Sequence, residues 1–86
     1  MIRITVRAQT PTEVVLQIEG NISEQAVETL KAEGQCWLSH KDRLVLDLAG
    51  VRFIDAAGIA LLRGWRGEGL VLRGASRFIG ALLERQ

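Results

Sequence analysis

The fold of this chain is decided by residues 44–62, which read LVLDLAGVRFIDAAGIALL. Residues 44–48 form a nearly continuous apolar run, which predicts a strand at the centre of a sheet, covered on both faces. Residues 49–54 are expected to form a short connector. Over residues 56–66 the apolar side chains recur at helical spacing, which predicts a helix.

Two further strands are predicted upstream of this stretch. Residues 2–7 alternate between apolar and polar side chains, which is typical of a half-buried strand. Residues 9–12 contain the only proline and indicate a turn. Residues 14–19 predict a second strand, antiparallel to the first because the link is short. Gly20 and Asn21 are expected to end it.

Two more helices are predicted, one on each side of the deciding stretch. Between Ile22 and Leu38 the apolar residues recur at helical spacing, behind Ser23 as a good N-cap. This helix is expected to fray or bend at Gly34. Downstream, residues 70–72 predict a fourth strand, and Ser76 caps a last helix.

The predicted fold class is therefore α/β, with a central mixed four-stranded sheet and three helices in the order β-β-α-β-α-β-α. A chain of 86 residues has room for one core, so residues 1–86 are interpreted as a single domain. The formal net charge is +1 and only two Phe and two Trp are present, which gives no indication of nucleic-acid binding.

The sequence predicts a cytoplasmic protein without direct membrane insertion. Cys36 is the only cysteine, which excludes an intramolecular disulfide and thiolate metal clusters and fits a reducing compartment. The N-terminus has no continuous apolar stretch of the kind that a signal peptide needs. The longest apolar runs are much shorter than a membrane span.

Few residues are available for catalysis. His40, the only histidine, lies in a polar loop and is interpreted as a solvated side chain. Cys36, beside Trp37, is interpreted as a buried small apolar residue because no activating partner is apparent. No nucleophile elbow, paired histidines or phosphate-binding loop is present. We therefore expect no catalytic residue, no metal site, no cofactor and no enzyme activity.

Two groups of charged residues allow two interpretations each. Asp47 lies inside an apolar strand, where its carboxylate either binds a partner or ion or, as we favour, accepts hydrogen bonds locally. Five arginines give the C-terminal half a positive bias, which indicates a solvated face or, less often, attraction of an acidic partner. These arginines are Arg63, Arg66, Arg73, Arg77 and Arg85.

The turn from Asp55 to Gly58 is the most informative motif. Asp55 is placed as the N-cap of the following helix, so its carboxylate can accept from the free amides of the first turn. Ala56 and Ala57 are small, so another chain can approach the backbone here. Gly58 allows tight packing of the helix start on the sheet. An ordinary capped helix start would have the same spacing.

At this point the chain resembles a known family. Residues 44–62 are similar to the central signature of STAS domains, which include bacterial anti-sigma-factor antagonists and the cytoplasmic tails of sulfate transporters. The family pattern is an apolar strand ending in Asp-Leu, a connector, then Asp-Ser-Ser-Gly or Asp-Ser-Thr-Gly and an apolar helix. Residues 20–23 stand where the family has Gly-x-Leu-Asp, and the predicted order of elements agrees along nearly the whole chain.

The resemblance implies docking onto a protein. Antagonists of this family bind an anti-sigma factor that is also a serine kinase, and the kinase phosphorylates the residue after the turn aspartate. A phosphate adds nearly two negative charges to the docking surface and breaks the complex. Here that position is Ala56, followed by Ala57, so the usual switch cannot operate. Ser23, where the family often has Asp, can still cap its helix but is neutral.

The sequence is compatible with three functions. The first is a protein-binding STAS module in bacterial signalling or partner switching, held in an unphosphorylated-like state. The second is a small cytoplasmic subunit of an ABC-type lipid transporter, since stand-alone STAS proteins accompany such transporters, with the helix start docked on the ATPase. Nucleotide binding is a third, which no glycine pattern supports. The expected partner-binding residues are Asn21, Ser23, Asp55, Ala56, Ala57, Gly58 and Ile59.

A homodimer also remains open at this stage. The opening hairpin leaves a sheet edge. The chain ends at Gln86, where longer family members add a strand and a helix, so extra apolar surface is expected to be exposed.

Overall fold

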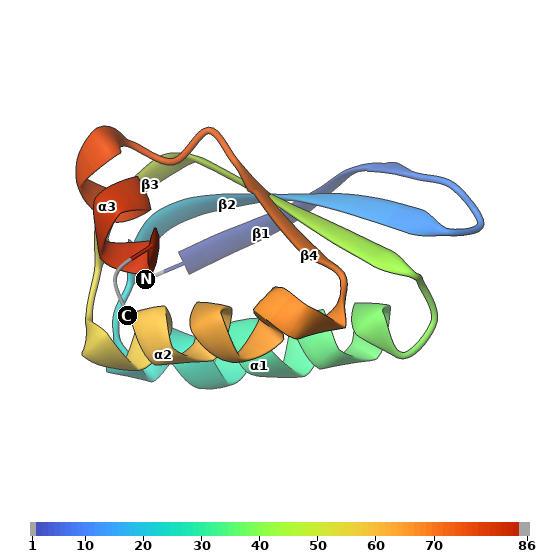
Figure 1. Ribbon diagram of the computed structural model, residues 1–86, viewed down its shortest axis with the longest axis horizontal. Helices are drawn as coiled ribbons and strands as arrows, with labels where there is room; N and C mark the ends of the chain where they lie inside the picture. The colour runs from blue at the N-terminus through green and yellow to red at the C-terminus, as the bar shows by residue number, and fades with distance from the viewer. Residues whose placement is uncertain (1, 85–86) are drawn as a thin grey trace.

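The computed structural model describes residues 2–84, apart from the side chains of Phe78 and Glu84. The described residues form four strands, three α-helices and one 3-10 turn in the predicted order (Figure 1). The elements are β1 (Ile2–Gln9), β2 (Glu13–Ile22), α1 (Glu24–Leu38), β3 (Arg43–Ile54), α2 (Ala56–Trp65), η1 (Arg66–Glu68), β4 (Leu70–Arg73) and α3 (Arg77–Glu84).

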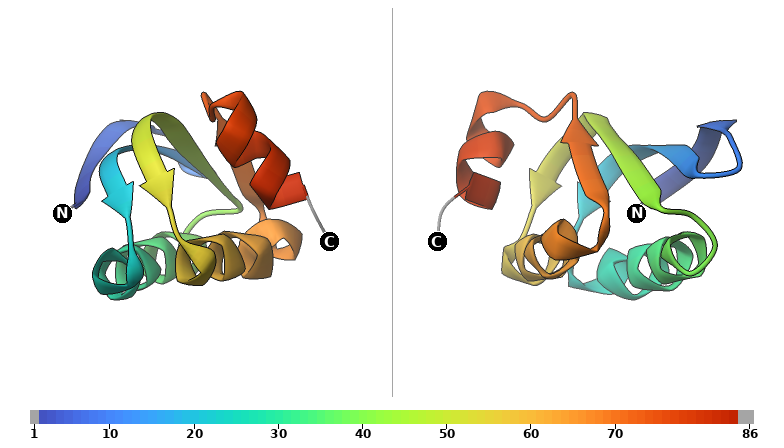
Figure 2. Two further views of the ribbon diagram at one scale, coloured as in Figure 1. Left: turned by 90° about the vertical axis from the view of Figure 1, so that its left-hand side faces the viewer. Right: turned by 45° about the vertical axis from the view of Figure 1, so that its right-hand side comes forward.

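The strands form one mixed sheet in the order β1-β2-β3-β4. β1 is antiparallel to β2, whereas β2, β3 and β4 are parallel to one another. The parallel connections run through α1 and α2, which lie side by side on one face of the sheet, while α3 flanks the β4 side (Figure 2). The predicted fold class is confirmed.

The core lies between the sheet and the two helices. Leu44 and Leu46 are fully buried on the face that α1 and α2 cover, which we call the inner face. Because successive side chains of a strand point to opposite faces, Val45 points to the outer face. Val45 is also buried, but its direct neighbours there are Val15 and Val71 of the adjacent strands.

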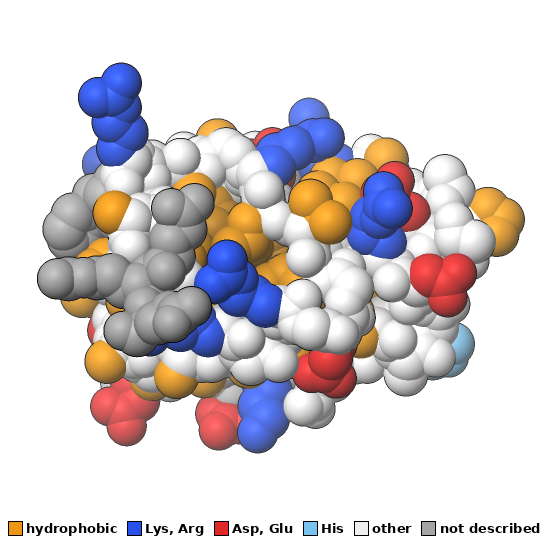
Figure 3. Space-filling model, viewed as in Figure 1, with side chains coloured by type: hydrophobic (Ala, Val, Ile, Leu, Met, Phe, Trp, Pro, Cys, Tyr) orange, Lys and Arg blue, Asp and Glu red, His pale blue; other side chains and the backbone are white. Residues whose placement is uncertain are grey.

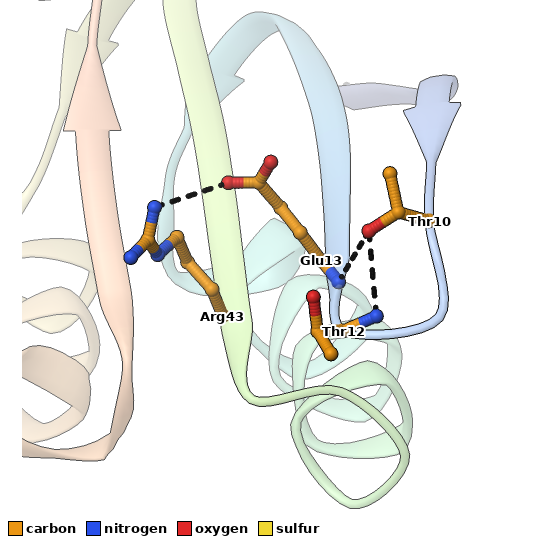
Figure 4. Close-up of polar contacts among 4 residues, drawn as sticks. All are labelled: Thr10, Thr12, Glu13 and Arg43. Carbon is orange, nitrogen blue, oxygen red and sulfur yellow. Dashed lines mark hydrogen bonds and ion pairs between the residues drawn. The ribbon is translucent and has the colours of Figure 1, made fainter.

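The hairpin turn between β1 and β2 is held by Thr10. Its side-chain Oγ1 accepts from the backbone amides of Thr12 at 3.3 Å and Glu13 at 3.1 Å (Figure 4). Lys41, from the loop after α1, donates to the carbonyl oxygen of Thr10 at 2.6 Å. The predicted turn is thus confirmed, and it is tied to the start of β3.

Two predicted strand ends are wrong. Residues 49–54 continue β3, and Gly20 and Asn21 do not end β2, because the two strands stay paired up to Ile22 and Ile54. Register shifts between Gln17 and Glu19 and between Gly20 and Asn21 interrupt the ladder without ending it. Gly20 has φ +103°, so a glycine that looks like a terminator serves here as an irregularity within a strand.

The expected fraying of α1 at Gly34 is also wrong, since α1 continues to Leu38. Gly34 is buried, and a Cβ atom there would overlap the indole ring of Trp65 in α2. Glycine therefore allows α1 and α2 to pack closely. Cys36 is exposed, which corrects its interpretation as a buried residue. The buried residues of α1 are Ala26, Leu30 and Gly34, and two residues beyond Gly34 the helix faces away from them.

No helix among residues 2–84 is both long and apolar enough to cross a membrane.

Candidate docking site

The two turns expected to bind a partner meet at one end of the sheet. β2 and β3 are parallel, and Ile22 pairs with Ile54 in register, so their carboxyl ends lie side by side. α1 begins after β2 and α2 after β3, at the same end of the molecule (Figure 1). The structure therefore brings Asn21 and Ser23 next to the turn from Asp55 to Ile59. We call this surface the docking site.

Asp55 is the N-cap of α2, as predicted. Its backbone is extended, with φ −93° and ψ −179°, and its side-chain carboxylate accepts from the amide of Gly58 at 2.9 Å. Its own backbone amide donates to the carbonyl oxygen of Ile22 at 3.0 Å. Asp55 thus fixes the helix start internally and also ties it to the end of β2.

Gly58 is buried against both strand ends. A Cβ atom on Gly58 would lie 2.7 Å from Cγ2 of Ile22 and 2.8 Å from Cγ1 of Ile54, closer than real side-chain contacts. The prediction that this glycine lets the helix start pack tightly is confirmed. The first turn of α2 therefore packs directly on the ends of β2 and β3.

The upper side of the same turn faces outward. Ala56 is exposed, Ala57 and Ile59 are half-buried, and Asn21 is exposed on the neighbouring strand end. Ala56 bears only a methyl group, so the centre of the turn is smooth and uncharged. A surface of small, uncharged side chains suits contact with another protein.

Ser23 occupies the N-cap position of α1, but its side chain makes no capping hydrogen bond. Its backbone carbonyl instead accepts from Ala26 at 2.8 Å and Val27 at 3.0 Å. The prediction that the Ser23 hydroxyl caps this helix is wrong. That half-buried hydroxyl is left without a capping role at the edge of the docking site.

Phe53 is a member of the site that the sequence analysis missed. Its side chain is 50% exposed, and it pairs in register with Asn21 at the end of β3. A signal was present in the sequence: in the pair Phe53 and Ile54, only one side chain of a strand can face the core. Ile54 is buried, so the aromatic ring of Phe53 is left half-exposed.

The other candidate residues lie outside the docking site. Asp47 accepts from the backbone amide of Ala49 at 3.0 Å, which confirms the local interpretation of its carboxylate. His40 is exposed beyond the far end of α1, where its Nδ1 lies 2.8 Å from the carbonyl oxygen of Cys36. Among residues 2–84, no three or more His, Cys, Asp or Glu side chains are grouped to hold a metal ion.

Two of the arginines have a structural role. Nη2 of Arg63 donates to the carbonyl oxygen of Leu82 at 2.8 Å, and Nη1 of Arg66 donates to that of Leu83 at 3.3 Å. These carbonyls belong to the last turn of α3, which has no helical partner for them. Arg63 and Arg66 therefore join α2 to α3. Arg73 and Arg77 are exposed, and Arg85 lies outside the described residues.

Comparison with known proteins relates the chain to one family. A family model described as "Mlab, STAS domain" matches residues 5–86. No curated protein matches the chain significantly.

Solved structures of anti-sigma-factor antagonists have a similar fold. The chain aligns with the antagonist SpoIIAA in its unphosphorylated form with a TM-score of 0.79 and 19% identity, over 95% of this chain and 82% of that one. An antagonist from Mycobacterium paratuberculosis aligns with a TM-score of 0.74 and 21% identity, over 96% and 77% of the two chains. A STAS-domain antagonist from Rhodobacter sphaeroides aligns with a TM-score of 0.64 and 22% identity, over 88% and 92%.

Proposed function

The chain belongs to the STAS family, and from this premise we propose that it is a non-enzymatic module that binds a protein partner through its docking site. The observation that carries the proposal is the construction of the turn at the start of α2. Asp55 and Gly58 hold the turn from below, whereas Ala56 is exposed at its centre. A turn that is fixed in place but has no reactive group is suited to recognition.

Phe53 supplies the anchor for such an interface. Aromatic side chains near the centre of an interface commonly contribute a large share of the binding energy. Phe53 is half-exposed at the end of β3, two residues before the N-cap Asp55. Together with the exposed methyl group of Ala56, the ring gives the docking site apolar contacts beside the polar side chains of Asn21 and Asp55.

We further propose that the module stays in an unphosphorylated-like state in the cytoplasm. The family's acceptor serine or threonine is replaced by Ala56, so a serine kinase has no hydroxyl to modify at the turn. A phosphate would otherwise place nearly two negative charges at the centre of this surface and oppose docking. The first candidate partner is an anti-sigma factor of the serine-kinase type, bound without this form of release, and the fold shared with anti-sigma-factor antagonists supports it.

The test restores the missing hydroxyl. Wild type and Ala56→Ser are each incubated with a kinase of this class and ATP, and phosphate is located by mass spectrometry. We expect phosphate on Ser at position 56 only in the variant, followed by loss of partner binding, and no binding-relevant phosphate on wild type. Stoichiometric phosphate on wild type that weakens binding would refute the unphosphorylated-like state.

A second candidate partner is the ATPase subunit of an ABC-type lipid transporter. One observation favours it: neither Ala56 nor Ala57 has the hydroxyl on which release from a kinase partner depends. Co-purification from the native host separates the candidates, because an ATPase and a serine kinase are readily distinguished by mass spectrometry. In either case the partner should be retained by wild type and lost with Ala56→Glu.

A further inference from the structure

A row of apolar side chains crosses the outer face of the sheet, on the side opposite α1 and α2. Ala8 pairs in register with Val15, Val15 with Val45 and Val45 with Val71, so each strand contributes one residue. We call these four residues the valine row. Val71 is 41% exposed and Ala8 is also exposed, and neither takes part in the core that the helices cover.

Charged residues border the valine row on both sides. On one side Arg43 and Glu13 form an ion pair across the neighbouring strands at 3.5 Å (Figure 4). On the other side Asp47 pairs in register with Arg73. In Figure 3 hydrophobic side chains gather over the strands between two groups of basic side chains. A small apolar centre with a charged border is typical of a protein interface.

We propose that a second copy of this chain covers the valine row in a two-fold symmetric dimer. In such a dimer the same surface is used on both copies and must complement itself. A two-fold axis along the valine row places each strand over its own counterpart, running in the opposite direction. The residue two positions before a row residue in one copy then faces the residue two positions after the same row residue in the other copy. This relationship can be checked against the charges on the outer face.

On β3 the charges that would face one another across the axis are opposite in sign. Arg43 lies two residues before Val45 and Asp47 two residues after it, so Arg43 of one copy faces Asp47 of the other. Symmetry repeats the contact, giving two ion pairs, one on each side of the axis. The side chain of Arg43 is 62% exposed, and Asp47 uses only Oδ1 for its bond to Ala49. Both groups therefore have atoms free to meet a second copy.

The neighbouring strands agree with β3. On β2 the same operation brings Glu13 over Gln17, which can donate a hydrogen bond to a carboxylate. On β4 it brings Arg73 over Gly69, which follows the acidic Glu68. No two like charges face one another along these three strands. A surface that served only an unrelated partner would have no reason to be complementary to itself in this way.

The dimer would leave both docking sites free. The valine row crosses the amino-terminal half of β3, whereas Phe53 and Asp55 lie at the carboxyl end of that strand. The inference is therefore independent of the proposed function. If the chain both dimerises and docks through this site, one dimer presents two docking sites. A partner that has two copies of the surface recognised by the docking site then binds the dimer with higher avidity than it binds a monomer.

Sedimentation equilibrium from micromolar to millimolar concentration tests the dimer. Wild type should associate reversibly to a dimer. Arg43→Glu and Asp47→Lys each place like charges opposite one another, and each should raise the dimer dissociation constant about tenfold or more. An equimolar mixture should dimerise again, because Glu at 43 then faces Lys at 47, and Asp47 faces Arg43 of the other chain.

Controls keep this outcome specific. Lys31→Glu, on the exposed side of α1, changes the net charge by the same amount as Arg43→Glu and should leave the dimer intact. Val71→Glu places a charge in the valine row itself and should abolish the dimer while Arg43 and Asp47 are unchanged. Circular dichroism checks that each variant is folded. A monomeric wild type over the whole range, a dimer insensitive to Val71→Glu, or a mixture of folded variants that stays monomeric would overturn the proposal.

Discussion

A Cβ atom on Gly58 would lie 2.7 Å from Cγ2 of Ile22, so the first turn of α2 rests directly on the end of β2. The hydrogen bond from the Asp55 amide to the Ile22 carbonyl, at 3.0 Å, connects the same two segments. Residues 21–23 and 53–59 are far apart in the chain, but these contacts make them parts of one surface. The docking site is therefore built from two chain segments that are joined by packing and by a hydrogen bond.

Replacing Gly58 by Ala should destabilise the protein by about 1–3 kcal/mol, because the added methyl group overpacks the contact with Ile22 and Ile54. Gly64 in the same helix is the matched control, since a Cβ atom there meets nothing within 4 Å. Gly64→Ala should stabilise the protein by roughly 0.5–1 kcal/mol through higher helix propensity. Urea unfolding of both variants measures the difference, and a shift of the same sign in both would contradict the packing described.

The two N-cap positions should respond differently to alanine. Asp55→Ala removes the bond to the Gly58 amide and should cost about 1 kcal/mol of the free energy of unfolding. Ser23→Ala removes a side chain that makes no capping bond, so it should cost well under half of that. Thermal and urea unfolding of the two variants measure the loss in the free energy of unfolding. Equal losses would show that the Ser23 hydroxyl contributes to capping after all.

Arg63 should control how firmly α3 is held. Its Nη2 donates to the Leu82 carbonyl, whereas Arg52 is exposed on β3 and serves as a control. Arg63→Met keeps much of the aliphatic length but removes the donors, so amide hydrogen exchange in α3 should accelerate while that in α1 stays unchanged. Arg52→Met should leave both helices unchanged. Unaltered exchange in α3 of the Arg63 variant would mean that apolar packing alone holds this helix.

The order of the elements could be predicted from the sequence because hydrophobic periodicity differs between strands and helices. The ends of the elements could not, because a glycine has several structural uses. Gly34 and Gly20 both looked like points where an element bends or ends. In the structure Gly34 makes room for Trp65, and Gly20 is an irregularity inside β2, and both uses depend on residues distant in sequence.

The residues of the docking site could be predicted only where their role depends on neighbours in sequence. The roles of Asp55 and Gly58 are local to one helix start, and capping and packing signals predicted them correctly. The exposure of Phe53 depends on which face of β3 it occupies, and this was hidden by the interpretation of residues 49–54 as a connector. Recognising those residues as a strand would have shown that Phe53 and Ile54 point in opposite directions.

Phe53→Ala tests the proposed anchor of the docking site. The variant removes the exposed ring, which makes little contribution to the core, so stability should change little while affinity for the co-purified partner falls about tenfold or more. Val6→Ala is a control, because Val6 is a similarly exposed apolar residue, 45% exposed, on β1 and outside the docking site. Equal affinity of Phe53→Ala and wild type for that partner would remove Phe53 from the interface.

Docking of the partner on the start of α2 can be measured by titrating the purified partner with wild type, Ala56→Glu and Ala32→Glu. Both alanines are exposed, and Ala32 lies on α1 outside the docking site. An acidic residue is tolerated in the first turn of a helix, so Ala56→Glu should fold normally. We predict that Ala56→Glu lowers the affinity at least about tenfold while Ala32→Glu binds like wild type. A folded Ala56→Glu variant that binds with wild-type affinity would contradict docking at this site.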